Sequence, residues 1–155
     1  MTHNKLAIFD IDGTIAHKNV IPESIGVGMT HLHEQGFLTT VSTGRGYARM
    51  KDVLGKHFET VVSPESLIIL EHGTKIVKRD GTVVRADYFK SNELDHIVDF
   101  VRANQGIIRI LWFISPDPAV RVQIWCKNQH EIEAETKTRG HYADLFHSSF
   151  DELRE

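Results

Sequence analysis

Leu6-Ala7-Ile8-Phe9-Asp10-Ile11-Asp12-Gly13-Thr14 is the stretch of sequence that decides the fold. Its apolar first half, Leu6–Phe9, predicts a buried strand, and the chain leaves this strand through two aspartates and a glycine turn. Open α/β sheets carry their active sites at the carboxyl ends of their strands. The stretch therefore predicts an α/β fold in which Asp10 and Asp12 lie at the functional edge of a parallel sheet.

The first 60 residues alternate between strand-like and helix-like segments. After the first strand we expect a helix from Pro22 to Gly36, a second buried strand at Phe37–Val41, a helix that ends near Gly55, and a third strand at Thr60–Val62. Proline is tolerated in the first turn of a helix, and glycine commonly ends one. The alternation is typical of a Rossmann-like parallel sheet with right-handed crossovers.

Short strands without an intervening helix follow. Leu67–Leu70 and Lys75–Val77 are predicted strands joined by a turn, and Asp80-Gly81 is a hairpin signal that leads the chain back into Val83 and Val84. From Ser91 onward the pattern changes to that of an α+β region. We expect a helix at its start, strands at 107–114 and 120–126, a helix at 128–137 and one more strand at 146–149.

This change in pattern, near Arg85–Lys90, divides the chain. We expect a Rossmann-like α/β domain over residues 1–88 and a smaller α+β domain over residues 89–155. The division follows from the order of the predicted elements, since parallel sheets need helical crossovers whereas α+β regions group their strands.

Composition limits the kinds of molecule that the protein is expected to bind and the compartment in which it is expected to occur. The formal net charge of −3 gives no general reason to expect binding to nucleic acid or to anionic membranes, and no apolar run approaches the ~20 residues that span a bilayer. The amino terminus passes into a strand without a signal-peptide pattern. Cys126 is the single cysteine, so no internal disulfide forms, which fits a reducing compartment. We therefore expect a cytoplasmic protein without nucleic-acid or membrane partners.

Two motifs resemble those of a known family. The stretch Phe9–Ile15 resembles the first motif of the haloacid dehalogenase-like (HAD) superfamily, most of whose members are Mg²⁺-dependent phosphatases. Thr43-Gly44-Arg45, at the end of the second predicted strand, is similar to the signature of the Cof-type, class IIB branch. The strand and hairpin over residues 67–84 are also similar to that branch, with His72-Gly73 where asparagine-glycine is usual. The region after Ser91 resembles the opening of the α/β cap of these proteins.

The resemblance implies a role for each of these residues. Asp10 is the expected nucleophile, which attacks phosphorus to form an aspartyl-phosphate, and Asp12 is the expected acid and base. Both carboxylates would also hold Mg²⁺. Gly13 and Thr14 are expected to offer backbone N–H groups to the phosphate of a small, sugar-phosphate-like metabolite. Thr43, Gly44 and Arg45 are expected to bind phosphate or substrate, although Arg45 has a second interpretation as the structural partner of an acidic neighbour.

The resemblance covers only part of the family's pattern. A third-motif lysine and a fourth-motif acidic pair follow the cap in the family, and no residue of this sequence is assigned to either. The chain is therefore expected to be the amino-terminal half of a phosphatase and impaired by itself. Two other functions stay open, a non-catalytic binding or regulatory module derived from the same fold, and a phosphomutase. Because the free edge of the first strand exposes backbone groups and apolar surface, we also expect association into dimers or larger species.

Overall fold

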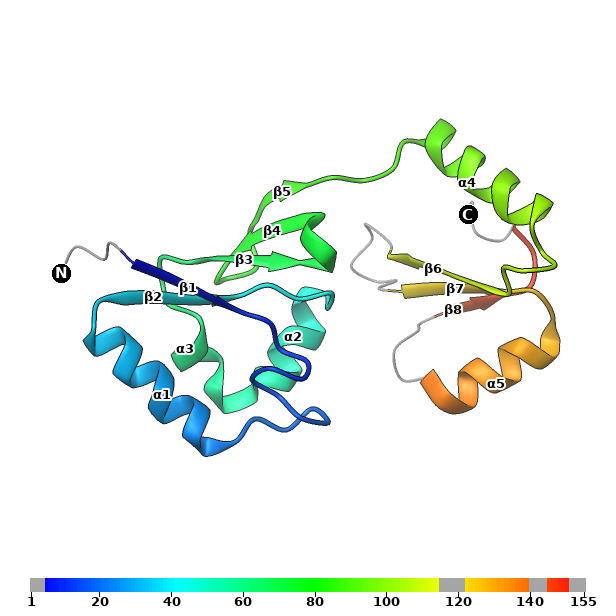
Figure 1. The fold of residues 1–155 in the computed structure, drawn as a ribbon. Coiled ribbons are helices and arrows are strands. Elements are labelled where there is room, and N and C mark those ends of the chain that lie inside the picture. Colours follow the sequence, from blue (N-terminus) through cyan, green and yellow to red (C-terminus); the bar gives the residue numbers. More distant parts are fainter. Residues whose placement is uncertain (1–4, 115–121, 140–144, 151–155) are drawn as a thin grey trace. The chain divides into compact units, whose positions relative to one another are not determined.

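The computed structural model describes residues 5–114, 122–139 and 145–150 (Figure 1). The chain divides into two compact units, Met1–Asp87 and Tyr88–Glu155, and each is described by itself. The division falls inside the segment where the order of the predicted elements changes.

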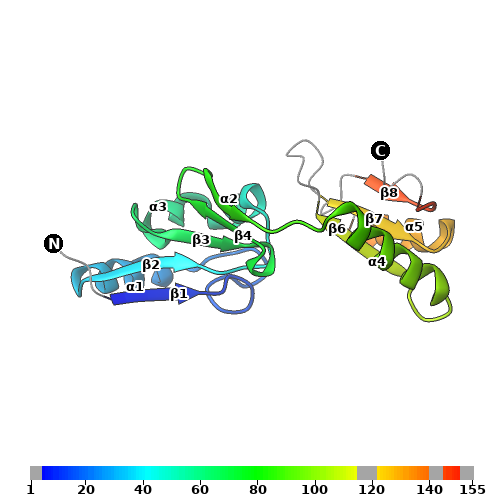
Figure 2. The same cartoon turned by 90° about the horizontal axis from the view of Figure 1, so that it is seen from above.

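The first unit begins with a parallel strand pair. β1 (Lys5–Phe9) lies beside β2 (Phe37–Val41), and helix α1 (Glu23–Glu34) makes the crossover between them. Helices α1, α2 (Tyr47–Leu54) and α3 (Phe58–Val61) lie on one face of this pair in both views of the fold (Figures 1 and 2). The register sets Leu6 opposite Leu38 and Phe9 opposite Val41, so both strands end at the same edge.

β1 is less buried than the sequence predicted. Leu6 and Ile8 are 57% and 49% exposed, whereas Phe9 packs against the core. Alternate residues of a strand point to opposite faces of the sheet. The helices cover one face, and β2 is the only strand that pairs with β1 within the described residues, so Leu6 and Ile8 stay exposed on the other face.

An antiparallel sheet continues from the end of β2. β3 (Leu67–Leu70), β4 (Lys75–Lys78) and β5 (Val83–Ala86) form it in that order, with a register shift between Ile76 and Val77. The backbone N–H of Thr43 donates to the Ile69 carbonyl oxygen (3.0 Å), which joins the loop after β2 to β3. The hairpin predicted at Asp80-Gly81 is present, with Gly81 at φ +90°.

The predicted strand at Thr60–Val62 is wrong. A 3₁₀ turn at Gly55–His57 leads into α3, and the Val62 N–H donates to the Phe58 carbonyl oxygen (3.0 Å). Val61 and Phe58 are buried three residues apart, which is the spacing of a helix face. The β-branched residues over Thr60–Val62 favoured a strand, but packing of this helix face against the core overrides that preference.

The core of the first unit lies between the helices and the strands. Its largest fully buried side chains belong to the loop after β1, to β2, to the helices and the residue that follows α3, and to β3 and β4; they are Ile11, Val41, Met50, Leu54, Val61, Val62, Ile68, Leu70 and Val77.

The second unit has an α-β-β-α-β order. Helix α4 (Ser91–Ala103) precedes β6 (Ile110–Ile114) and β7 (Val122–Cys126), and helix α5 (Gln129–Arg139) precedes β8 (Leu145–His147). The sheet order is β6-β7-β8, antiparallel between β6 and β7 and parallel between β7 and β8. The two helices lie on opposite faces of this sheet (Figures 1 and 2).

The core of the second unit centres on one tryptophan. Trp125 of β7 stacks on Phe150 with the ring centroids 4.2 Å apart, and Val98 and Val101 of α4 complete the buried cluster. Among the described residues, no helix is long and apolar enough to cross a membrane.

Candidate active site

The loop after β1 forms a tight turn that presents the two aspartates. The Ile11 carbonyl oxygen accepts N–H bonds from Ile15 (3.2 Å) and Ala16 (2.8 Å), while the Ile11 side chain is fully buried. Gly13 has φ +79°, a conformation that favours glycine, and its N–H donates to the Ala16 carbonyl oxygen (2.9 Å). Because Ile11 is anchored in the core, Asp10 and Asp12 on either side of it project away from the core.

The loop after β2 supplies the opposite side of the same site. Thr43 is 4% exposed, and its Oγ1 accepts the N–H of Arg45 (3.2 Å). The Thr43 carbonyl oxygen accepts the N–H of His72 (3.3 Å), so the turn after β3 is tied to this loop. Helix α2 begins only at Tyr47, with Gly46 as its N-cap, so Gly44 and Arg45 belong to the loop that precedes the helix.

These loops enclose a cleft of about 490 Å³ at the carboxyl edge of β1 and β2. Its lining residues are Asp10, Asp12, Ser42, Thr43, Gly44, Arg45 and His72. Gly13 and Thr14, which the sequence predicted as phosphate-binding residues, follow in the turn and do not line this cleft. Ser42 and His72 were missed as site residues, and the only signal for the second was the His72-Gly73 turn in place of asparagine-glycine.

Arg45 joins three segments of the site. Its Nε donates to Asp12 Oδ2 (2.8 Å), and its Nη2 donates to Asp12 Oδ1 (2.7 Å) and to Asn19 Oδ1 (2.7 Å). Of the two roles left open for Arg45, pairing with an acidic neighbour is therefore present. The hydrogen bond from Arg45 holds the pKa of Asp12 below its usual range, although partial burial acts in the opposite direction. Asp12 is thus kept ionised at neutral pH in this arrangement.

His72 packs against Gly44 without room for a side chain between them. A Cβ placed on Gly44 would lie 2.4 Å from His72 Cε1 and 2.5 Å from His72 Nε2. His72 itself has φ +58°, in the left-handed region, as does the preceding Glu71 at φ +53°. The His72 ring therefore lies where a side chain on residue 44 would otherwise be, and any larger residue at position 44 would displace this ring.

We expect Gly44→Ala to displace the exposed His72 ring and to destabilise the protein by less than about 1 kcal/mol, because the close atoms belong to the far end of this side chain and not to the backbone. Chemical denaturation would measure this loss. Gly28→Ala is the matched control, since a Cβ there meets nothing within 4 Å and alanine favours the helix. His72→Ala should rescue Gly44→Ala in a double-mutant cycle. His72 ring signals in the ¹H NMR spectrum that stay unchanged in the Gly44→Ala protein would contradict the close packing.

The side chains of the cleft include oxygen ligands of the type that a hard divalent cation binds. Asp10 and Asp12 provide carboxylate oxygens, which Mg²⁺ prefers. Among the described residues, no group of three or more His, Cys, Asp and Glu side chains lies close enough together to hold a metal ion. The cleft therefore offers the right ligand type from two side chains, one of which is engaged by Arg45.

Comparisons with known proteins show which solved structures have a similar fold. No curated protein matches the sequence significantly. Among solved structures, a phosphatase of the haloalkanoate (HAD) superfamily from Bacteroides thetaiotaomicron is similar at a TM-score of 0.71 and 17% identity, with 97% of this chain and 51% of that chain covered. A sugar phosphatase of HAD subclass IIB is similar at 0.69 and 16%, with 96% and 54% covered.

A further similar structure is a haloacid dehalogenase-like hydrolase from B. subtilis, at a TM-score of 0.64 and 15% identity, with 97% of this chain and 56% of that chain covered. The chain thus spans about half the length of the solved structures it matches. Identities this low support the fold alone, and they confirm the predicted α/β class with a parallel sheet. The family profile of the haloacid dehalogenase-like hydrolases matches residues 7–154. With that match over nearly its whole length, the chain belongs to the haloacid dehalogenase-like hydrolase family.

Proposed function

We propose that the protein is a Mg²⁺-dependent phosphatase that acts on a small phosphorylated metabolite through an aspartyl-phosphate. The observation that carries this proposal is the meeting of Asp10, Asp12 and Thr43 in one cleft at the carboxyl edge of β1 and β2. Membership of a hydrolase family supports the reaction class. A sugar-phosphate-like substrate is supported by the sugar phosphatase among the similar structures.

Asp10 would attack the phosphorus atom in line, which splits one difficult displacement into two easier steps. Asp12 would protonate the leaving oxygen and later take a proton from the attacking water. The contact with Arg45 lowers the pKa of Asp12 and therefore opposes the first of these tasks. A bound phosphate group competes for the same guanidinium, so substrate binding would loosen this contact and let the pKa of Asp12 rise.

Asp10 and Asp12 are the residues that would hold Mg²⁺, which would neutralise charge on the transferring phosphoryl group. The hydroxyl of Thr43 would hydrogen-bond the same group, and its position in the lining of this cleft supports the role. We further propose that residues 1–88 form the family's core domain and residues 89–155 part of its cap. In this proposal the first unit carries the catalytic residues, and the second unit contributes to substrate selection. We further propose that the protein acts in the cytoplasm.

A non-catalytic module is the second candidate, and one observation favours it. Both carboxylate oxygens of Asp12 accept hydrogen bonds from Arg45, and no third acidic ligand stands near within the part of the chain that the structure describes. A protein that keeps this arrangement when phosphate is present would bind rather than turn over its ligand.

Metal removal tests the proposal directly. The full product of the gene, assayed with para-nitrophenyl phosphate, is expected to hydrolyse it with Mg²⁺, to lose the activity in EDTA and to regain it when Mg²⁺ is added back. Initial rates before and after chelation give the measurement. Hydrolysis that survives EDTA would contradict a metal-dependent mechanism, and the absence of turnover under every condition would favour the non-catalytic module.

A further inference from the structure

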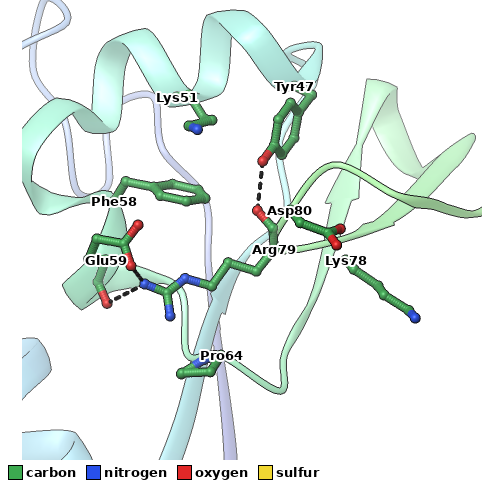
Figure 3. A pocket seen from close by; sticks show the side chains of 8 residues that line it. All are labelled: Tyr47, Lys51, Phe58, Glu59, Pro64, Lys78, Arg79 and Asp80. Carbon is green, nitrogen blue, oxygen red and sulfur yellow. Dashed lines mark hydrogen bonds and ion pairs between the residues drawn. The ribbon is translucent and has the colours of Figure 1, made fainter.

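A second cleft, of about 410 Å³, lies on the first unit between α2, α3 and the turn from β4 to β5 (Figure 3). None of its lining residues lines the first cleft, which contains Asp10, Asp12 and Thr43 and is called the Asp10 cleft below. The lining residues of the second cleft are Tyr47, Lys51, Phe58, Glu59, Pro64, Lys78, Arg79 and Asp80. Its volume lies within the range of small-molecule sites.

Two aromatic rings form the apolar part of this cleft. Lys51 Nζ lies 5.0 Å from the centre of the Phe58 ring and 5.7 Å from the centre of the Tyr47 ring. The Arg79 guanidinium lies 5.8 Å from the Phe58 ring, so this ring has a cation near it from both α2 and the hairpin turn (Figure 3). Phe58 is 5% exposed, so only a small part of its ring faces the cleft, and the half-buried Tyr47 ring offers the larger apolar contact to a flat group near the positive charge.

The Tyr47 ring is held in place from two directions. Its hydroxyl donates to the Arg79 carbonyl oxygen (2.6 Å), as the upper dashed line of Figure 3 shows. Gly81 faces the same ring, and a Cβ on Gly81 would approach Tyr47 Cε1 to 2.9 Å. The ring is therefore preorganised, which lowers the entropy cost of binding a ligand against it.

The charges of the cleft leave one cation in excess. Arg79 forms an ion pair with Glu59. Asp80 accepts the N–H of Thr82 (2.8 Å), and this bond holds the pKa of Asp80 below its usual range.

Lys51 has no carboxylate within ion-pair distance among the described residues, and its ammonium faces the two rings. Lys78 extends away from the rings in Figure 3. Three cationic and two anionic side chains line the cleft. Glu59 offsets Arg79 and Asp80 offsets Lys78, so a single negative charge on a ligand would balance Lys51.

We propose that this cleft binds a small aromatic monocarboxylate, with its ring against Tyr47 and Phe58 and its carboxylate on Lys51. A dianion such as a phosphate monoester fits less well, because Glu59 and Asp80 would repel its second charge. An aliphatic carboxylate would lack the ring contact. The ligand class therefore differs from that of the Asp10 cleft, and the site is independent of the function proposed above.

Benzoate is the probe for this site, followed in ¹H–¹⁵N spectra of the labelled protein. The backbone amides of Tyr47, Lys51 and Arg79 are expected to shift saturably with benzoate. Acetate, which has the charge without the ring, and phenylphosphonate, which has the ring with two charges at alkaline pH, are expected to bind at least about tenfold more weakly. Equal binding of all three anions would overturn the proposed selectivity.

Lys51→Met keeps the aliphatic stem and removes the charge, and it is expected to weaken benzoate binding about tenfold. Lys127→Met is the matched control, since this exposed lysine lies in the second unit and should leave the affinity unchanged. Unaltered binding by the Lys51→Met protein would overturn the proposal. So would shifts confined to the amides around Asp10 and Thr43, or no saturable shift at all.

Discussion

Asp10→Asn is expected to lower aryl-phosphate hydrolysis by the full gene product at least about a thousandfold, since removal of a nucleophile has effects of this size or larger in other enzymes. Asparagine keeps the shape of aspartate but has no anionic oxygen to attack phosphorus. Asp10 lines the cleft beside Asp12 and Thr43, so the loss should appear in kcat and not only in KM. Initial rates over a range of substrate concentrations separate the two parameters.

Asp52→Asn is the matched control for this change. Asp52 lies exposed on α2 and does not line the cleft, so the same chemical substitution there should leave kcat within about twofold. If the Asp10→Asn protein keeps a substantial part of the parent activity, Asp10 is not the nucleophile. Thermal denaturation of both variants shows whether a lost activity reflects chemistry or folding.

Trp125→Ala is expected to destabilise the second unit by about 3–5 kcal/mol, the usual cost of removing a buried tryptophan side chain. Trp125 is 1% exposed and stacks on Phe150, and it lies in one cluster with Val98 and Val101. Its loss would open a cavity between α4 and the sheet. The first unit has its own core and is expected to keep its stability.

Urea denaturation followed by the fluorescence of the remaining tryptophan, Trp112, reports on the second unit in this variant. Two controls accompany it. Phe100→Ala, at a residue that is 63% exposed, should change stability by less than about 1 kcal/mol. Trp125→Phe should cost far less than Trp125→Ala, because Trp125 Nε1 has no hydrogen-bond partner among the described residues. A Trp125→Ala protein that unfolds with the parent's midpoint would show that this cluster does not stabilise the unit.

Local sequence was enough for the elements with a strong pattern. The apolar stretch before Asp10 predicted β1, and the proline and glycine at the two ends of α1 predicted that helix, with bounds that differ by one or two residues. The Asp80-Gly81 signal predicted the β4–β5 hairpin because a positive φ at Gly81 requires little from the rest of the fold. Family membership followed from short motifs that lie at strand ends.

Where the sequence pattern is weak, the conformation and burial of a segment depend on its tertiary contacts. Thr60–Val62 has strand propensity, yet the segment forms the end of α3 because Phe58 and Val61 both reach the core only from a helix. Likewise the burial of β1 could not be predicted from its apolar residues alone, since burial depends on which elements cover each face of the sheet.

The sequence by itself determined the α/β class, the family and the placement of Asp10, Asp12 and Thr43 at strand ends, because each depends on residues close together in the chain. Tertiary structure alone decided the contacts between distant segments. These are the pairing of Arg45 with Asp12, the packing of His72 on Gly44, and the second cleft, where Tyr47 meets the turn at Arg79. Such contacts join residues some 30 positions apart, and they form only once the loops after β1, β2 and β3 and the hairpin turn are brought together by the packed core.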